Sequence, residues 1–244
     1  MNSTKSNLAA KNKKPIFKNN NLTQLFKLIS EKRGFFALIL ATLVSQLYIT
    51  YYVSENIKIE DEDEKNNNTI KFNSKLIGAY IAAFVLILIL AFITMPPWLK
   101  FILFSLFSGA FGVILGYRKS GVDPNIIKSA LVGTGSIFVA MFAFGVALIA
   151  SGIKLGLRFG LGLFFALLFL LIVSIVQFFI VGSSFLKKII VIGSLMVFSL
   201  YIMYDTNSIL QRNYNGDFIT ASLDYYLDII YIFNGLLTGL ELGD

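Results

Sequence analysis

The chain of 244 residues contains no cysteine and no histidine, and only 14% of its residues are charged. Without cysteine there can be no disulfide bond, thiolate metal site or cysteine nucleophile. Without histidine, any proton sensing or general base chemistry falls to carboxylates, lysine or tyrosine. Soluble domains carry about 25% charged residues. The low charged fraction, together with 56% hydrophobic residues, therefore predicts an all-α polytopic membrane protein.

The basic residues are concentrated at the amino terminus, where residues 1–33 carry eight lysines and arginines against one acid, Glu31. Positive charge beside a first span keeps that end cytosolic, so the net charge of +7 reflects topology rather than a nucleic-acid partner. We expect residues 1–33 to be a cytosolic, partly disordered segment and residues 34–244 to be a seven-span membrane domain whose carboxyl terminus lies on the far side. The expected spans are 34–53, 76–95, 99–117, 126–150, 155–181, 189–210 and 218–240.

Small and polar residues indicate how these spans are connected and packed. Pro96 and Pro97 cannot continue a helix, so they predict a tight turn between the second and third spans. Gly112 and Gly116 lie one turn apart on the third span, a spacing that lets another helix approach closely. Gln177 is the one strongly polar residue of the fifth span, and we interpret it as an interhelical hydrogen-bonding residue.

Three charged or modifiable features fall on the predicted outer side. The acidic run Glu60–Glu64 is interpreted as a solvated loop, with cation attraction as the alternative. Asn67 begins an Asn-Asn-Thr sequon and is the glycosylation candidate of the chain. Arg118 and Lys119 also fall outside by strict alternation of the spans, against the usual bias of basic residues to the cytosol.

Three aspartates interrupt the last two apolar runs, and they are the candidate functional residues. Asp224 and Asp228 lie four residues apart and therefore on one face of a helix, while Asp205 belongs to the preceding span. At ~1.5 Å per residue, Asp205, Asp224 and Asp228 lie roughly 8, 9 and 15 Å from the cytosolic face. Ionisable groups at such depth are expensive and usually functional. The three carboxylates are expected to share one internal site.

The segment from Tyr204, YDTNSIL, and the run from Ala221, ASLDYYLDIIYIF, resemble the transmembrane Bax inhibitor motif family, and DPNIIKSALVGTGSIF from Asp123 resembles it more loosely. The resemblance covers most of the chain from about Gly34 and rests on the spaced aspartates. It implies a bundle of seven helices with the last one central, in an endoplasmic reticulum or Golgi-type membrane.

The same resemblance implies a function and roles for residues. Such proteins suppress programmed cell death and lower stored calcium through a pH-sensitive leak. Asp205 and Asp228 match the acidic pair proposed to sense pH and gate the pore, and Asp224 is an added acid on the ion pathway. No cofactor is implied; calcium is the transported ion, and the partners are the bilayer and cell-death regulators.

The residues themselves add two expectations about this site. Calcium prefers several hard oxygen ligands, so Asp205, Asp224 and Asp228 with carbonyls and water could hold it weakly. Two neighbouring carboxylates removed from water resist carrying two charges, so Asp205 and Asp228 are expected to share a proton that holds the sixth and seventh spans together. Loss of that proton at higher pH should separate the spans and open the leak.

Two other classes of function remain open at this stage. One is a non-conducting membrane protein that binds cell-death regulators or other channels. The other is an intramembrane aspartyl protease, in which two carboxylates activate water. That enzyme class needs Gly-x-Gly-Asp at the start of a late span, whereas Glu241 to Asp244 reads Glu-Leu-Gly-Asp. The sequence therefore favours a protein that is not an enzyme.

Overall fold

The computed structural model describes residues 19–57, 74–179, 184–211 and 214–243. Within these ranges the chain forms seven α-helices and one short 3-10 helix, and it contains no strand. The helices are α1 (Asn19–Asn56), α2 (Ser74–Phe92), α3 (Pro97–Lys119), α4 (Pro124–Ala150), α5 (Leu157–Phe179), α6 (Ser184–Gln211) and α7 (Phe218–Glu241), with η1 (Tyr214–Gly216) before α7.

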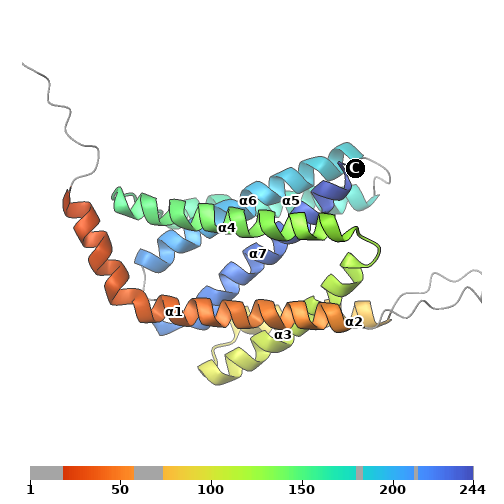
Figure 1. The fold of residues 1–244 in the computed structure, drawn as a ribbon, viewed down its shortest axis with the longest axis horizontal. Helices are drawn as coiled ribbons and strands as arrows, with labels where there is room; N and C mark the ends of the chain where they lie inside the picture. Colours follow the sequence, from red (N-terminus) through yellow and green to blue (C-terminus); the bar gives the residue numbers. More distant parts are fainter. Residues whose placement is uncertain (1–18, 58–73, 180–183, 212–213, 244) are drawn as a thin grey trace, which may run out of the picture.

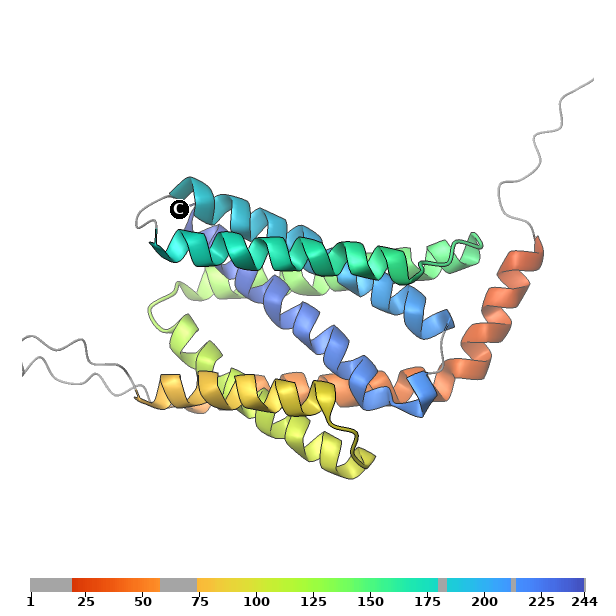
Figure 2. The same ribbon diagram turned by 180° about the vertical axis from the view of Figure 1, so that it is seen from behind.

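The helices form two layers with α7 between them (Figure 1). In one layer α3 packs against α1 and α2, and in the other α6 packs against α4 and α5. Seen from either side, α7 runs diagonally between the layers, where it contacts α1, α4 and α6 (Figure 2). The predicted architecture, a helical bundle with the last helix central, is therefore confirmed.

Helix α7 differs from the other six in hydropathy as well as in position. Within the described residues, α1 to α6 each contain a segment long and apolar enough to cross a membrane. Helix α7 carries Asp224, Asp228 and Asn234, but much of its surface, including Tyr225 and Tyr226, is buried against protein. A helix enclosed by other helices does not need a lipid-compatible surface all round. The chain is thus a multi-pass integral membrane protein, and its enclosed helix α7 is the one described α-helix that is not among the six candidate spans.

Local chemistry fixes where several helices begin. Pro96 caps α3 and Pro97 occupies its first turn, where a missing backbone donor is harmless. Asp123 and Asp217 cap α4 and α7, their carboxylates accepting from the backbone N–H groups of Asn125 and Thr220. The predicted turn at the prolines is present, although α2 ends at Phe92, three residues earlier than its predicted span.

The close packing predicted for Gly112 and Gly116 is confirmed between α3 and α1. A Cβ atom added at Gly112 would lie 2.8 Å from the carbonyl oxygen of Thr50, and one at Gly116 would lie 3.1 Å from that of Ser54. Both contacts are to helix backbone, which cannot move aside as a flexible side chain could. Small residues therefore set the distance between these two helices.

Three features of the sequence lie outside the described residues. They are the amino-terminal residues 1–18 of the predicted disordered segment, the acidic run Glu60–Glu64 and the sequon at Asn67. The predictions made for them stand as predictions.

Candidate functional site

The structure brings Asp205 of α6 and Asp228 of α7 together inside the bundle. The two carboxyl groups act on each other electrostatically, and the residues are only 7% and 4% exposed. Ionised carboxylates only accept hydrogen bonds, so a bond between two carboxyl groups requires a proton on one of them. The structure thus brings together the two carboxyl groups that the sequence analysis paired, and the proton that they are expected to share stays a prediction.

One oxygen atom of this carboxyl pair lacks a hydrogen-bond partner within the described part of the chain. The Oδ2 atom of Asp228 is buried and has no hydrogen-bond partner among the described residues. An unpartnered buried acceptor is expensive unless water or an ion approaches it. It marks Asp228 as the point of the site most ready to accept a ligand.

Asp224 lies one helical turn from Asp228 and has a different environment. Its Oδ2 accepts a hydrogen bond of 3.4 Å from the hydroxyl of Tyr214, at the end of the bundle where η1 leads into α7. Within the described part of the chain, no three acidic side chains are grouped to hold a metal ion. The weak calcium site expected at Asp205, Asp224 and Asp228 stays a prediction, and in this conformation Asp224 bonds to Tyr214.

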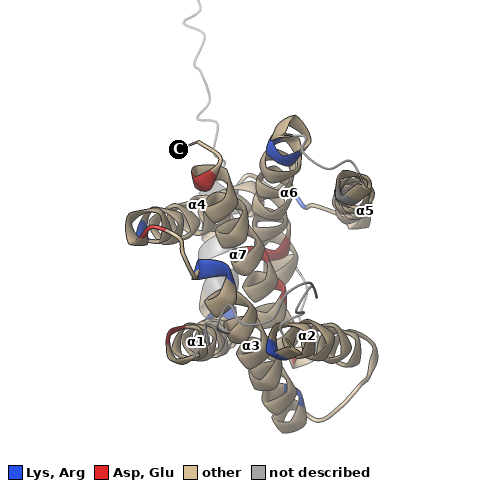
Figure 3. Cartoon of the chain, turned by 90° about the vertical axis from the view of Figure 1, so that its right-hand side faces the viewer, with Lys and Arg blue, Asp and Glu red and all other residues tan. Residues whose placement is uncertain are grey.

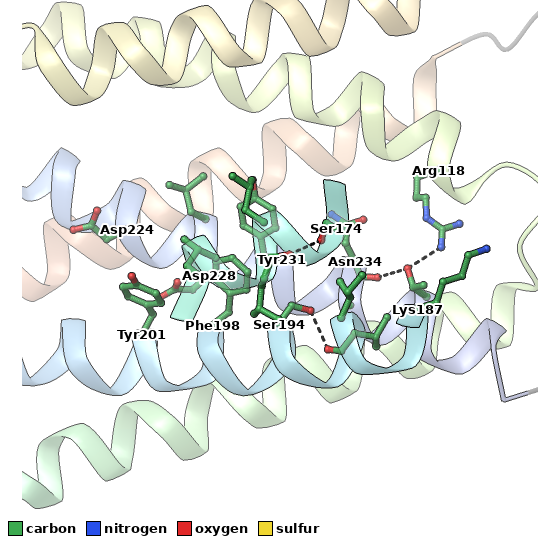
Figure 4. Close-up of a pocket in the computed structure, with 18 of the residues that line it drawn as sticks. Arg118, Ser174, Lys187, Ser194, Phe198, Tyr201, Asp224, Asp228, Tyr231 and Asn234 are labelled. Carbon is green, nitrogen blue, oxygen red and sulfur yellow. Dashed lines mark hydrogen bonds between the residues drawn. The ribbon is translucent and has the colours of Figure 1, made fainter. Parts of the chain in front are cut away.

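All three aspartates line one cavity of about 1110 Å³, enclosed by residues of α2, α3, α5, α6 and α7. Figure 4 shows Asp224 and Asp228 toward one end and Arg118 and Lys187 at the other. Serine, asparagine and threonine side chains lie between the two ends of the cavity. The asparagine and the threonine both belong to α7. A single continuous space thus joins the carboxyl pair to the opposite end of α7. The polar residues between the ends are Ser174, Ser194, Asn234 and Thr238.

Hydrogen bonds hold α7 to both layers at the level of the carboxyl pair. Tyr225 shares a hydrogen bond of 2.8 Å with Thr206 of α6. On the opposite face, Tyr226 shares one of 2.6 Å with Thr50 of α1. Both tyrosines are fully buried, so each bond is shielded from competition with water. The backbone that carries Asp228 is therefore fixed from two sides.

Asn207 is a positioning residue that the sequence analysis did not single out. It follows Asp205 by two residues and is fully buried. Its amide nitrogen donates to the carbonyl of Ile153 at 3.1 Å, and its side-chain oxygen accepts from the N–H of Leu155 at 2.8 Å. These bonds join α6 to the connection between α4 and α5. The sequence signal that could have identified Asn207 is an amide side chain within the apolar run that contains Asp205.

The basic residues at the outer end of α3 are paired with acids of neighbouring helices. Arg118 binds Glu241 of α7 through both carboxylate oxygens and also donates to Thr238 at 3.1 Å. Lys119 binds Glu55 of α1. Figure 3, which looks along the helices, shows that most of the bundle is drawn in tan, without Lys, Arg, Asp or Glu. These ion pairs reduce the net charge of the predicted outer face, which explains how basic residues occur there.

The opposite end of α7 is held by Lys100 and Asp217. The Lys100 ammonium donates to Asp217 and to Thr220, each at 2.5 Å. Partial burial raises the pKa of Asp217, but the hydrogen bonds from Lys100 and Thr220 outweigh it and hold that pKa below its ordinary value. This contact joins the first turns of α3 and α7, beside the end where Tyr214 covers Asp224.

Replacing Asp217 with asparagine is expected to lower the thermal unfolding midpoint at neutral pH, because asparagine can cap the helix but cannot pair with Lys100. The Asp217 side chain is 37% exposed, so solvent screening limits the expected loss to about 1 kcal/mol. The contribution is complete above the unfolded-state pKa of about 4 and disappears as the pH falls through the lower folded-state pKa.

Asp123→Asn is the matched control, because Asp123 also caps a helix but forms no ion pair within the described residues. Unfolding midpoints of the two variants and the parent, measured from neutral to acidic pH, test the prediction. The deficit of Asp217→Asn should shrink on acidification. A deficit that stays constant, or one of equal size in Asp123→Asn, would contradict it.

The fold and site define a polytopic membrane protein with a buried pair of aspartates between its last two helices. The sequence matches the family described as inhibitor of apoptosis-promoting Bax1 over residues 29–244, and the chain belongs to that family.

Individual relatives agree with this assignment. A BI1-like protein of Arabidopsis thaliana is 28% identical over 214 residues, covering 86% of this chain and 81% of the relative. Bax inhibitor 1 of Schizosaccharomyces pombe is 30% identical over 157 residues, covering 63% and 58% respectively. The Golgi anti-apoptotic protein of Vaccinia virus (strain Lister) is 30% identical over 122 residues, covering 50% and 49%.

Proposed function

We propose that the protein is a pH-sensitive calcium leak channel of intracellular membranes, which lowers stored calcium and thereby suppresses programmed cell death. The observation that carries this proposal is the buried carboxyl pair of Asp205 and Asp228 in the wall of a cavity. A carboxyl pair that must share a proton to stay closed responds to pH, and its ionised form attracts cations.

The chemistry of the cavity supports a divalent cation as the transported species. Carboxylates, hydroxyls and amide oxygens are the hard ligands that calcium prefers. They line the cavity from Asp224 to Thr238, whereas the two basic residues lie at its far end. A cation moving along α7 would exchange water for these oxygens in turn. Conduction of this kind is transport rather than enzymatic catalysis.

The described conformation corresponds to the closed state of such a channel. At the end of α7 nearest Asp224, Tyr214 binds Asp224, and Lys100 binds Asp217. In the middle, a proton shared by Asp205 and Asp228 would join α6 to α7. Opening would require α6 and α7 to separate, and the space would then reach both faces of the membrane.

The printed names of two relatives support the physiological part of the proposal. One is a Bax inhibitor and another is a Golgi anti-apoptotic protein. By that similarity this chain acts in cell-death suppression at an endoplasmic reticulum or Golgi-type membrane. Cell-death regulators in the same membrane are its expected protein partners.

Calcium release from liposomes containing the purified protein tests the conducting function. At slightly alkaline pH the parent should release calcium at least about tenfold faster than Asp228→Asn, a difference equivalent to ~1.4 kcal/mol in the barrier. Calcium should also pass faster than magnesium, which gives up its water reluctantly. Equal effects of the two ions would contradict a calcium-adapted path.

The same assay separates conduction from a purely binding role. If neither protein releases calcium, the leak proposal fails, and a membrane regulator that binds cell-death proteins or other channels becomes the better explanation. A circular dichroism spectrum and a thermal unfolding midpoint for Asp228→Asn distinguish lost conduction from lost folding.

A further inference from the structure

The cavity beside α7 has two ends of opposite charge. Asp224 and Asp228 lie toward one end, and Arg118 and Lys187 lie at the other (Figure 4). Between them the wall is largely aliphatic and aromatic, contributed by α2, α5 and α6. A ligand that filled the half beyond the carboxyl pair would therefore meet an apolar wall and a basic end. The apolar wall is formed by Ile87, Leu167, Leu170, Leu171 and Phe198.

Two polar groups at the basic end have no partner among the residues that the structure describes. Arg118 is already paired with Glu241 and Thr238. By contrast, neither the Lys187 ammonium nor the Gln177 amide forms a hydrogen bond or ion pair with any described residue. The interhelical hydrogen bond expected for Gln177 is not formed with any described residue, and the side chain lines the cavity. Polar groups in or near the hydrocarbon layer are costly to leave unsatisfied.

The unpartnered groups specify the chemistry of a ligand. A lysine offers one positive charge and three donors, and a glutamine amide offers two donors and one acceptor. A phosphate diester satisfies both, since it carries a negative charge and several acceptor oxygens. Gln177 lies near the end of α5 and Lys187 near the start of α6, so both are close to the ends of candidate membrane spans.

The cavity lies next to the bilayer rather than sealed inside the bundle. Helix α2 packs on α3 and helix α5 packs on α6, and within the described ranges no extensive packing joins α2 to α5. Both helices nevertheless contribute to the wall of the cavity. Their remaining surfaces expose large apolar side chains, among them Phe84 and Phe169, that suit contact with lipid.

We propose that this cavity binds one anionic phospholipid, with its phosphate at Lys187 and Gln177 and one acyl chain along the apolar wall of α5. The charge at Lys187 favours an anionic over a zwitterionic headgroup, and the apolar wall favours a lipid over a free phosphate. The site lies in the same cavity as the proposed cation path, but at its far end from the carboxyl pair, and lipid binding can be measured without ion conduction.

Stabilisation of the purified protein by added lipid tests the site. In a non-ionic detergent, phosphatidylglycerol should raise the thermal unfolding midpoint at lower concentrations than phosphatidylcholine, by about fivefold for one lysine near the surface. Glycerol phosphate, which has the headgroup but no acyl chain, should have no effect at the same concentrations. Equal stabilisation by glycerol phosphate would overturn the lipid in favour of a free anion.

Adjacent lysines provide the matched control. Lys187→Gln should remove the preference for phosphatidylglycerol, while Lys188→Gln should retain it, because only Lys187 lines the cavity. Equal losses in both variants would mean general attraction to a basic surface and would overturn the proposal. So would retention of the full preference in Lys187→Gln.

A second variant tests the place of the acyl chain without touching the charge. Ser174 lines the cavity and bonds only to Leu170 of its own helix, so Ser174→Phe fills space without breaking a contact between helices. This variant should require severalfold more phosphatidylglycerol for the same stabilisation. An unchanged response in a variant with a normal unfolding midpoint would show that the chain lies elsewhere.

Discussion

Asp205→Asn and Asp228→Asn are each expected to abolish the pH dependence of calcium release between about pH 5 and pH 8, and to hold release near the low level of the acidified parent. Asparagine resembles a protonated carboxyl group in shape but cannot lose a proton. Either substitution therefore leaves at most one charge at the pair, so the repulsion that should separate α6 from α7 cannot develop.

The sign of the response follows from the proposed proton between the two carboxyl groups. At low pH this proton should join Asp205 to Asp228 and hold α6 against α7. When it leaves, the two charges should repel; two unit charges ~4 Å apart repel by ~4 kcal/mol at an effective dielectric constant of 20. Release by the parent should therefore rise with pH and fall on acidification.

Ionisable groups near Asp205 and Asp228 influence the titration of the pair, but they cannot themselves produce the pH response. The neighbouring ionisable residues are one further carboxylate and several tyrosines, and no lysine or arginine is among the described groups that act on the pair. Since tyrosines stay neutral up to about pH 10, they do not titrate in the tested range. The chain has no histidine that could produce the response. The neighbours are Asp224, Tyr201, Tyr214 and Tyr225.

Asp224→Asn is the matched control for this experiment. It makes the same chemical change one turn along the same helix, at a residue that bonds to Tyr214 rather than to Asp205. Because its charge still acts on the pair, its removal should shift the midpoint of the profile while preserving the response. If Asp205→Asn and Asp228→Asn both keep the parent profile, the carboxyl pair is not the sensor.

The sequence identified the carboxyl pair because aspartates stand out in apolar helices. It placed Asp205 and Asp224 at similar depths and Asp228 deeper, by counting residues along straight, parallel helices. In the structure α7 runs diagonally between the layers (Figure 1), so Asp228 rather than Asp224 meets Asp205. Residue counting could not supply this tilt, which depends on packing against both layers.

The partners of buried polar groups also could not be predicted from the sequence. Arg118 looked like an exception to the charge rule for loops, yet it pairs with Glu241, more than one hundred residues away. Asn207 and Tyr226 likewise bond to segments distant in the chain. Composition predicts that such groups need partners, but only the three-dimensional arrangement decides which partners they find.

The contact between α4 and α6 at Gly145 yields the second prediction of large effect. A Cβ atom at Gly145 would lie 2.7 Å from the carbonyl oxygen of Met203 and 2.8 Å from the Cβ of Thr206. Both atoms belong to the part of α6 that adjoins Asp205, and neither is the end of a flexible side chain. Gly145→Ala should therefore destabilise the protein by about 1–3 kcal/mol.

Gly135→Ala is the control on the same helix, since nothing lies within 4 Å of a Cβ atom at that position. There alanine should be neutral or stabilising by up to about 1 kcal/mol, because it favours helix more than glycine does. Unfolding midpoints of both variants in the same detergent measure the difference. Equal effects would show that the close approach at Gly145 does not limit stability.

Gly145→Ala should also disturb the packing around Asp205 and Asp228, because it displaces residues of α6. Thr206 bonds to Tyr225 at 2.8 Å, so a methyl group that displaces Thr206 also loosens α7 beside Asp228. Gly145→Ala is therefore expected to release calcium faster than the parent at acidic pH, where the closed state prevails, while Gly135→Ala releases it at the parental rate. If Gly145→Ala is destabilised but releases calcium at the parental rate at acidic pH, the prediction is contradicted. The packing of α4 on α6 would then have no effect on whether the channel stays closed.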